Sequence, residues 1–117
     1  MDKRVKLTIN DTLAFYDDYV GDYVFNESNV QTYDYFFKVP SEFLAGEHLN
    51  ENSINLILKF LYGENWQSGN EDGSRFMILQ TKSQLLSDAN ADEWLSRSYC
   101  YSVDETGKVS KISPQEF

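Results

Sequence analysis

Two segments near the start of the chain alternate apolar and polar residues with the period of a β-strand. Val5, Leu7 and Ile9 alternate with polar neighbours over 5–9, and aromatic or apolar residues occupy every second position over 33–39. Successive side chains of a strand point to opposite faces, so each segment predicts a strand with one face on a core. Weaker patterns of the same kind predict strands over 23–25, 75–81, 99–103 and 108–112,.

The clearest helical pattern covers residues 54–61. Ile54, Ile57, Leu58 and Leu61 share one face at helical spacing, which indicates a helix that is largely buried. We expect Asn52 to cap its first turn and Gly63 to end it, and the residues at 67–73 to form a polar loop,.

Three further helices are predicted from shorter signals. Residues 11–20 place Leu13, Tyr16 and Val20 on one helical face, with Asp11 as N-cap and Gly21 as the stop,. The aromatic and β-branched residues of this segment also favour strands. Shorter helices are expected after Ser41, which follows Pro40, and over 91–96, where Asn90 would be the cap; a turn is expected at 26–29 and another at 104–107,.

These elements predict a single α+β domain. We expect one mainly antiparallel sheet of about four to six strands with two or three helices packed on it. The chain has 117 residues, a length typical of one domain. The domain is expected to span 1–112, and the polar tail at 113–117 is expected to fray,.

The charge balance excludes several classes of function. The chain has 19 Asp and Glu against 10 Lys and Arg, a net charge of −9, which disfavours direct binding to nucleic acid or to an anionic membrane.

No apolar run reaches the roughly 18 residues of a membrane-spanning helix, and the first residues lack the apolar centre of a signal peptide,. A single cysteine cannot form an internal disulfide,, so we expect a cytoplasmic protein.

Sequence motifs for catalysis and metal binding are weak. Cys100 and His48 could form a nucleophile and base only if folding brings them together,. The acidic segment at 88–92 matches the start of a calcium loop, but Glu93 stands where the loop needs glycine,. A helix start explains these residues better. The sequence therefore favours a non-enzymatic protein without metal or cofactor, and a small carboxylate enzyme ranks last among the hypotheses.

The most informative feature is an acidic, aromatic segment without basic residues. No Lys or Arg occurs between Leu7 and Phe37, whereas Asp, Tyr and Phe recur throughout. Carboxylates bind arginine in bidentate pairs, and tyrosine rings accept cations. Buried aromatics and solvated acids are the alternative interpretation. The candidate partner-binding residues are Tyr16, Asp17, Asp18, Tyr19, Asp22, Tyr23, Glu27 and Asp34, with a second cluster at Trp66, Glu71 and Asp72.

Two interpretations of function follow. The first is a small acidic binding or inhibitor protein, of the immunity-protein or anti-defence type, that blocks a basic surface of a toxin, a nuclease or a nucleic-acid-handling enzyme and could mimic nucleic acid. The alternative is a housekeeping or small-ligand-binding domain whose acidity serves only solubility. No pattern in the sequence indicates an oligomeric state.

Overall fold

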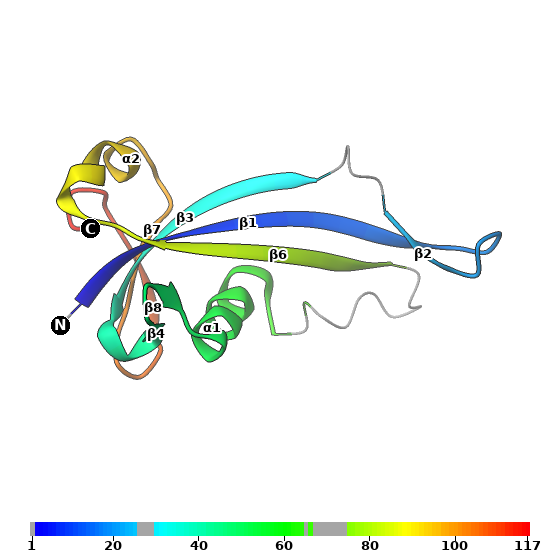
Figure 1. Cartoon of the computed structure of the whole chain (residues 1–117), viewed down its shortest axis with the longest axis horizontal. Helices are drawn as coiled ribbons and strands as arrows, with labels where there is room; N and C mark the ends of the chain where they lie inside the picture. Colours follow the sequence, from blue (N-terminus) through cyan, green and yellow to red (C-terminus); the bar gives the residue numbers. More distant parts are fainter. Residues whose placement is uncertain (1, 26–29, 65, 67–74) are drawn as a thin grey trace.

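The computed structural model describes residues 2–25, 30–64, 66 and 75–117. The molecule is elongated, with principal extents of 51 × 29 × 25 Å. A body that carries the helices lies at one end, and a long ribbon of strands projects from it (Figure 1). The predictions for 26–29 and 67–73 lie outside the described residues.

The strand β1, Asp2–Asp17, organises the sheet. It pairs antiparallel with β3, Gln31–Pro40, on one side and with β6, Arg75–Leu85, on the other. The short strand β2, Asp22–Val24, folds back on its far end. Strand β7, Cys100–Val103, runs parallel to β3 and forms a hairpin with β8, Val109–Ile112. The predicted α+β fold is therefore confirmed as a mixed sheet of six strands with two helices.

The helix predicted over 11–20 is wrong, because β1 continues to Asp17. Residues 11–15 pair with β6, and residues 15–17 pair with β2. Burial alternates with strand period in this stretch: Thr12 and Ala14 are buried, whereas Leu13 and Phe15 are exposed. The backbone hydrogen bonds and side-chain contacts of two neighbouring strands outweigh a helical spacing that these residues support only weakly.

Helix α1, Glu51–Tyr62, covers one face of the sheet. It buries Ile57 and Leu58 against the odd-numbered side of β1 and against Phe37 of β3. Gly63 ends the helix as predicted, but the N-cap is Asn50 rather than Asn52. The Asn50 side chain accepts a hydrogen bond from the Ser53 backbone N–H at 2.9 Å, so the helix begins at Glu51 and includes the residue expected to cap it.

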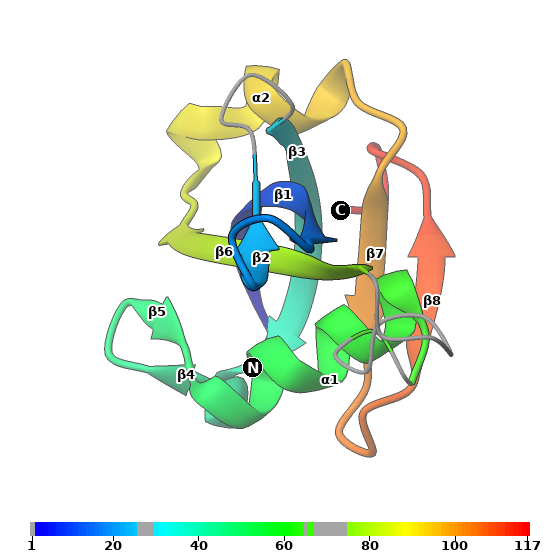
Figure 2. The ribbon, with the colours of Figure 1, turned by 90° about the vertical axis from the view of Figure 1, so that its right-hand side faces the viewer.

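The opposite face is covered by η3, Asp88–Asn90, and α2, Ala91–Leu95 (Figure 2). Trp94 packs there with Phe36, Leu86, Cys100 and Phe117. The predicted helix is confirmed one residue shorter, but Asn90 makes no side-chain capping bond to it. Its Oδ1 instead accepts from the Ser87 backbone N–H, within the capping box that starts the preceding turn.

The expectation that residues 113–117 fray is wrong for the end of this segment. Phe117 is only 2% exposed, and its ring lies 5.2 Å from Trp94 and 5.9 Å from Phe36. Arg4 Nε donates a hydrogen bond to the Phe117 carbonyl oxygen at 2.9 Å. Burial of this aromatic ring more than offsets the entropy lost by ordering a few polar residues.

Smaller elements complete the body. The turn η2, Ser41–Phe43, follows Pro40 where a short helix was predicted. The strands β4, Leu44–Ala45, and β5, His48–Leu49, form a separate two-stranded ladder before α1. No helix in the described part of the chain is long and apolar enough to cross a membrane.

Candidate partner-binding surface

The part of the sheet that projects beyond the helices is called the arm here, and comprises residues 11–25, 30–34 and 75–80. It contains the end of β1, all of β2 and the beginnings of β3 and β6 (Figure 1). Most of the exposed large apolar side chains among the described residues lie on it: Leu13, Phe15, Tyr16, Tyr19, Val20, Tyr23, Val24, Phe25 and Val30.

The exposure of the arm has a simple structural cause. Val5, Leu7 and Ile9 lie on the face of β1 that α1 covers. The end of α1 reaches Asp11, whose carboxylate Oδ2 accepts a hydrogen bond from the Tyr62 hydroxyl at 3.3 Å. Leu13 and Phe15 continue the same face of the strand and are exposed. The apolar side of β1 therefore extends farther than the helix that buries it.

The tip of the arm is a tight turn stabilised by a carboxylate. Asp17 Oδ1 accepts from the backbone N–H groups of Tyr19 and Val20 at 2.8 and 3.4 Å. Gly21 adopts a positive φ of 73°, which favours glycine at the end of this turn. The turn presents Tyr19 fully to solvent, at 102% relative exposure. Behind it, the Tyr16 and Tyr23 rings pack edge to face, with centroids 5.5 Å apart.

The candidate carboxylates of the arm differ in their surroundings. Asp17 shapes the turn, whereas Asp18 and Asp22 are exposed beside it. Asp22 Oδ1 accepts from the backbone N–H of Tyr23 at 2.7 Å. Asp34 is half-buried at the base of the arm and accepts from the Thr8 hydroxyl at 2.7 Å. The tip therefore brings together the six candidates between positions 16 and 23, and Asp34 lies apart from them.

Of the second predicted cluster, the structure describes Trp66 alone. Trp66 is half-buried and packs against the hydrophobic cluster to which α1 contributes Ile57 and Leu58. This position is that of a packing residue rather than of an exposed anchor. Glu27, Glu71 and Asp72 lie outside the described residues.

Not every aromatic of the acidic segment faces outward. Phe36 and Phe37 are buried on opposite faces of β3. Tyr35 lies within a group of rings that includes Tyr99 and Tyr101, and burial raises the pKa of its hydroxyl. The outward display predicted for this segment therefore holds for the arm and fails where β3 enters the body.

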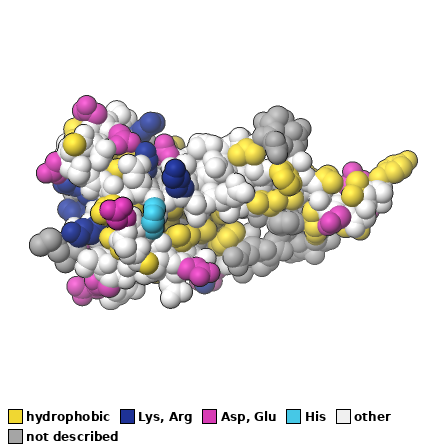
Figure 3. All heavy atoms as spheres, viewed as in Figure 1, with side chains coloured by type: hydrophobic (Ala, Val, Ile, Leu, Met, Phe, Trp, Pro, Cys, Tyr) yellow, Lys and Arg dark blue, Asp and Glu magenta, His cyan; other side chains and the backbone are white. Residues whose placement is uncertain are grey.

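Charge is distributed unevenly along the molecule. Both ion pairs found among the described residues lie in the body, between Arg4 and Asp88 at 2.6 Å and between Lys6 and Glu93 at 2.8 Å. The Lys6 hydrogen bond holds the pKa of Glu93 below its usual value. Figure 3 shows Lys and Arg side chains over the body, and carboxylates beside hydrophobic side chains at the tip. Among the described residues, no ion pair involves a carboxylate of the tip.

Several exposed residues of this surface were missed by the sequence reasoning. None of Leu13, Val20, Val24, Phe25 and Val30 is among the candidate binding residues of the sequence, yet all five are exposed on the arm. The usable signal was the strand alternation of 12–15, in which small or polar side chains alternate with large apolar ones.

The possible Cys–His pair is not formed. Cys100 is fully buried beside Trp94, with its Sγ 3.9 Å from the Trp94 carbonyl oxygen. His48 is exposed on β5, with Nδ1 2.9 Å from the Ser83 carbonyl oxygen of β6. Burial raises the pKa of the Cys100 thiol, whereas a nucleophilic cysteine needs a lowered one.

We expect Cys100 to be inert in the folded protein. At pH 8, where the raised pKa keeps it a thiol, Ellman's reagent should label it at least about 100-fold more slowly in buffer than in 6 M guanidinium chloride, because reaction requires unfolding. Absorbance at 412 nm measures this. Fast stoichiometric labelling in buffer would contradict the burial of the thiol.

The segment that resembles the start of a calcium loop is explained by other contacts. Asp88 pairs with Arg4, and Asn90 closes the turn with Ser87. Within the described ranges, no three His, Cys, Asp or Glu side chains are grouped as metal ligands.

Comparisons of the chain with protein-family models, with curated proteins and with solved structures gave no match.

Proposed function

We propose that this chain is a small acidic binding protein that blocks a basic surface of a partner protein through its arm. The observation that carries the proposal is the tip, where exposed tyrosines stand beside exposed carboxylates. Tyrosine is enriched among the residues that contribute most to protein–protein affinity, because its ring buries a large area and its hydroxyl forms hydrogen bonds.

Exposure of so many apolar side chains in one region favours binding over solubility alone. Single exposed apolar residues are common on soluble proteins, but contiguous exposed patches are typical of interaction sites. An acidic domain that needed charge only for solubility would bury Phe15, Tyr19 and Phe25 rather than carry them away from its core. This observation supports the binding hypothesis against the housekeeping alternative.

The charge of the arm indicates the chemistry of the partner. Residues 7–37 contain no Lys or Arg, so the negative potential of Asp18 and Asp22 is not offset by neighbours in sequence. Exposed carboxylates steer a basic partner during encounter and form charge-assisted hydrogen bonds with its arginines. Basic surfaces of this kind occur on toxins, nucleases and other nucleic-acid-handling enzymes, where phosphates normally bind.

The proposed mechanism is steric and electrostatic. Within the arm, β1 pairs with β6 over residues 11–15 and with β2 over residues 15–17, so every residue of this part of β1 has at least one partner strand. The tip is thereby presented in a preformed conformation, and little entropy is lost on binding. An arm bound in a basic groove of the partner would keep the partner's anionic substrate out of that groove. The carboxylates of the arm would take the place of some of the substrate's negative charges. The protein would thus inhibit its partner by binding alone, without catalysing a reaction.

The test is a comparison of two charge-reversed proteins. Asp18→Lys combined with Asp22→Lys reverses the tip. Glu47→Lys combined with Glu105→Lys makes the same change in net charge at exposed positions of the body. The wild-type chain and both variants are immobilised, incubated with a lysate of the source organism at 50 mM and 500 mM NaCl, and the retained proteins are identified by mass spectrometry.

We expect the wild-type chain and the body variant to retain one basic protein at low salt and to lose it at high salt, because screening weakens exposed charge pairs. The tip variant should retain at least about 10-fold less of it. Retention that is equal for both variants, or that does not respond to salt, would contradict the proposal. Absence of any retained basic protein at both salt concentrations would also count against it.

A further inference from the structure

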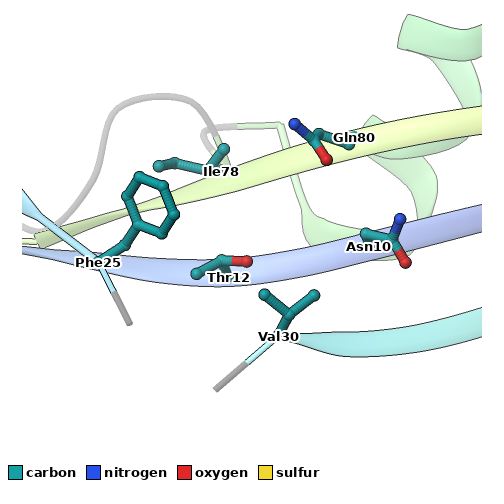
Figure 4. A pocket seen from close by; sticks show the side chains of 6 residues that line it. All are labelled: Asn10, Thr12, Phe25, Val30, Ile78 and Gln80. Atoms are coloured by element: carbon teal, nitrogen blue, oxygen red, sulfur yellow. The ribbon is translucent and has the colours of Figure 1, made fainter. Parts of the chain in front are cut away.

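A cavity of about 310 Å³ opens on the arm, on the face of β1 opposite α1. Asn10 and Thr12 of β1, together with Ile78 and Gln80 of β6, form its floor, and Phe25 and Val30 flank it where the chain returns from β2 to β3 (Figure 4). The cavity is at the small end of the about 300–1,000 Å³ typical of small-molecule sites. Its size suits one long side chain better than a large ligand.

The lining of the cavity has an apolar part and a polar part. In Figure 4 the Phe25 ring lies near Ile78, with Val30 on the other side of Thr12. Phe25 and Val30 are exposed, so an occupant would remove their apolar surface from water. Asn10 and Gln80 lie together toward the body end, as the pairing of β1 with β6 requires.

The polar part offers oxygen acceptors in a row. Asn10 Oδ1 already accepts from the Thr32 hydroxyl at 2.8 Å and has a second lone pair. Gln80 is exposed, so its amide can rotate to present oxygen. Two residues farther along β1 toward the body, Thr8 lies opposite Asp34 of β3 and opposite Lys82 of β6. Among the described side chains that line the cavity, none carries a positive charge.

We infer that this cavity binds an arginine side chain of the partner, an inference that rests on the proposed function and names the residue type the arm recognises. The aliphatic stem of arginine would pack on the Phe25 and Val30 side chains. Its planar guanidinium carries five N–H donors, which suit the oxygens of Asn10 and Gln80. Lysine has the same charge but no planar group to lie against the ring. A purely aliphatic side chain would form no hydrogen bond with either amide group.

The test uses the full-length protein and small probes in place of the partner. N-acetyl-L-arginine N-methylamide is titrated into isotope-labelled protein, and the side-chain amide signals of Asn10 and Gln80 are followed by NMR. The citrulline, lysine and norleucine counterparts are titrated in parallel. Citrulline retains the planar shape and loses the charge, and norleucine retains only the stem.

Two matched variants locate the binding. Gln80→Arg places a guanidinium of this chain at the rim of the cavity. Gln84→Arg adds the same charge at another exposed position on the same face of β6 and outside the cavity. Because both positions are exposed, neither substitution removes packing from the core.

We expect the arginine probe to saturate with a dissociation constant on the order of millimolar, as befits one side chain, and each other probe to bind at least about 5-fold more weakly. Gln80→Arg should weaken binding about 10-fold or more, and Gln84→Arg by less than about 2-fold. Equal binding of norleucine, equal losses in both variants, or no shift of the two amides would overturn the inference. The probe titration tests the arginine site, whereas the lysate experiment tests binding of a basic protein by the tip. Because the two measurements are independent, either proposal can fail while the other holds.

Discussion

Replacing Phe37 with alanine is expected to lower the free energy of unfolding by about 3–5 kcal/mol, the usual cost of removing a buried aromatic ring from a core. Phe37 is 0% exposed and stacks on Tyr101 with centroids 5.2 Å apart. It also lies opposite Val5 on β1 and opposite Tyr101 on β7. The substitution would leave a void where the central strands and α1 meet.

Urea denaturation followed by circular dichroism measures this loss. Phe15→Ala is the matched control, because it removes the same atoms from β1 at a position that is 47% exposed. We expect the control to lose no more than about 1 kcal/mol. Similar losses in the two variants would contradict the division between a buried body and an exposed arm.

Replacing Tyr19 with alanine is expected to have the opposite profile: stability unchanged within about 0.5 kcal/mol, and affinity for the basic partner lowered at least about 10-fold. The ring is fully exposed, so it contributes little to the folded state. The turn that carries it depends on the backbone N–H of Tyr19 and the carboxylate of Asp17, and the alanine variant retains both. The ring is therefore free to bury its whole area in an interface.

Surface plasmon resonance with the purified partner measures the affinity, and thermal unfolding measures the stability. Tyr99→Ala serves as the control, because Tyr99 is half-exposed on the body. Its ring contacts Tyr35, so we expect a loss of stability with little change in affinity. Unchanged affinity of the Tyr19 variant would remove the tip from the interface.

The two substitutions at Phe37 and Tyr19 separate the parts that stabilise the fold from those available for binding. The body contains both hydrophobic clusters and both ion pairs of the described residues. The arm adds backbone hydrogen bonds but exposes most of its large apolar side chains. A protein can retain such an exposed apolar surface when a partner covers it during function.

Local patterns were sufficient for much of the body. The alternation of Val5, Leu7 and Ile9 determined a strand with one buried face, and the helical spacing of Ile57 and Leu58 determined a buried helix that stops at Gly63. The turn at 104–107 between β7 and β8 also followed from its residues. In each case one short stretch of chain carries the whole signal, because its periodicity matches one regular structure.

The arm was decided only by tertiary structure. Residues 11–17 have side chains compatible with a helix or a strand. Pairing of residues 11–15 with β6, sixty or more positions later, and of residues 15–17 with β2 selects the strand. Whether Leu13 or Tyr19 is buried depends on where α1 stops relative to β1, which no local pattern encodes. The cavity likewise needs side chains from separate parts of the chain. Sequence alone determined which segments could form strands and helices, but long-range pairing and packing decided which apolar surfaces remained uncovered.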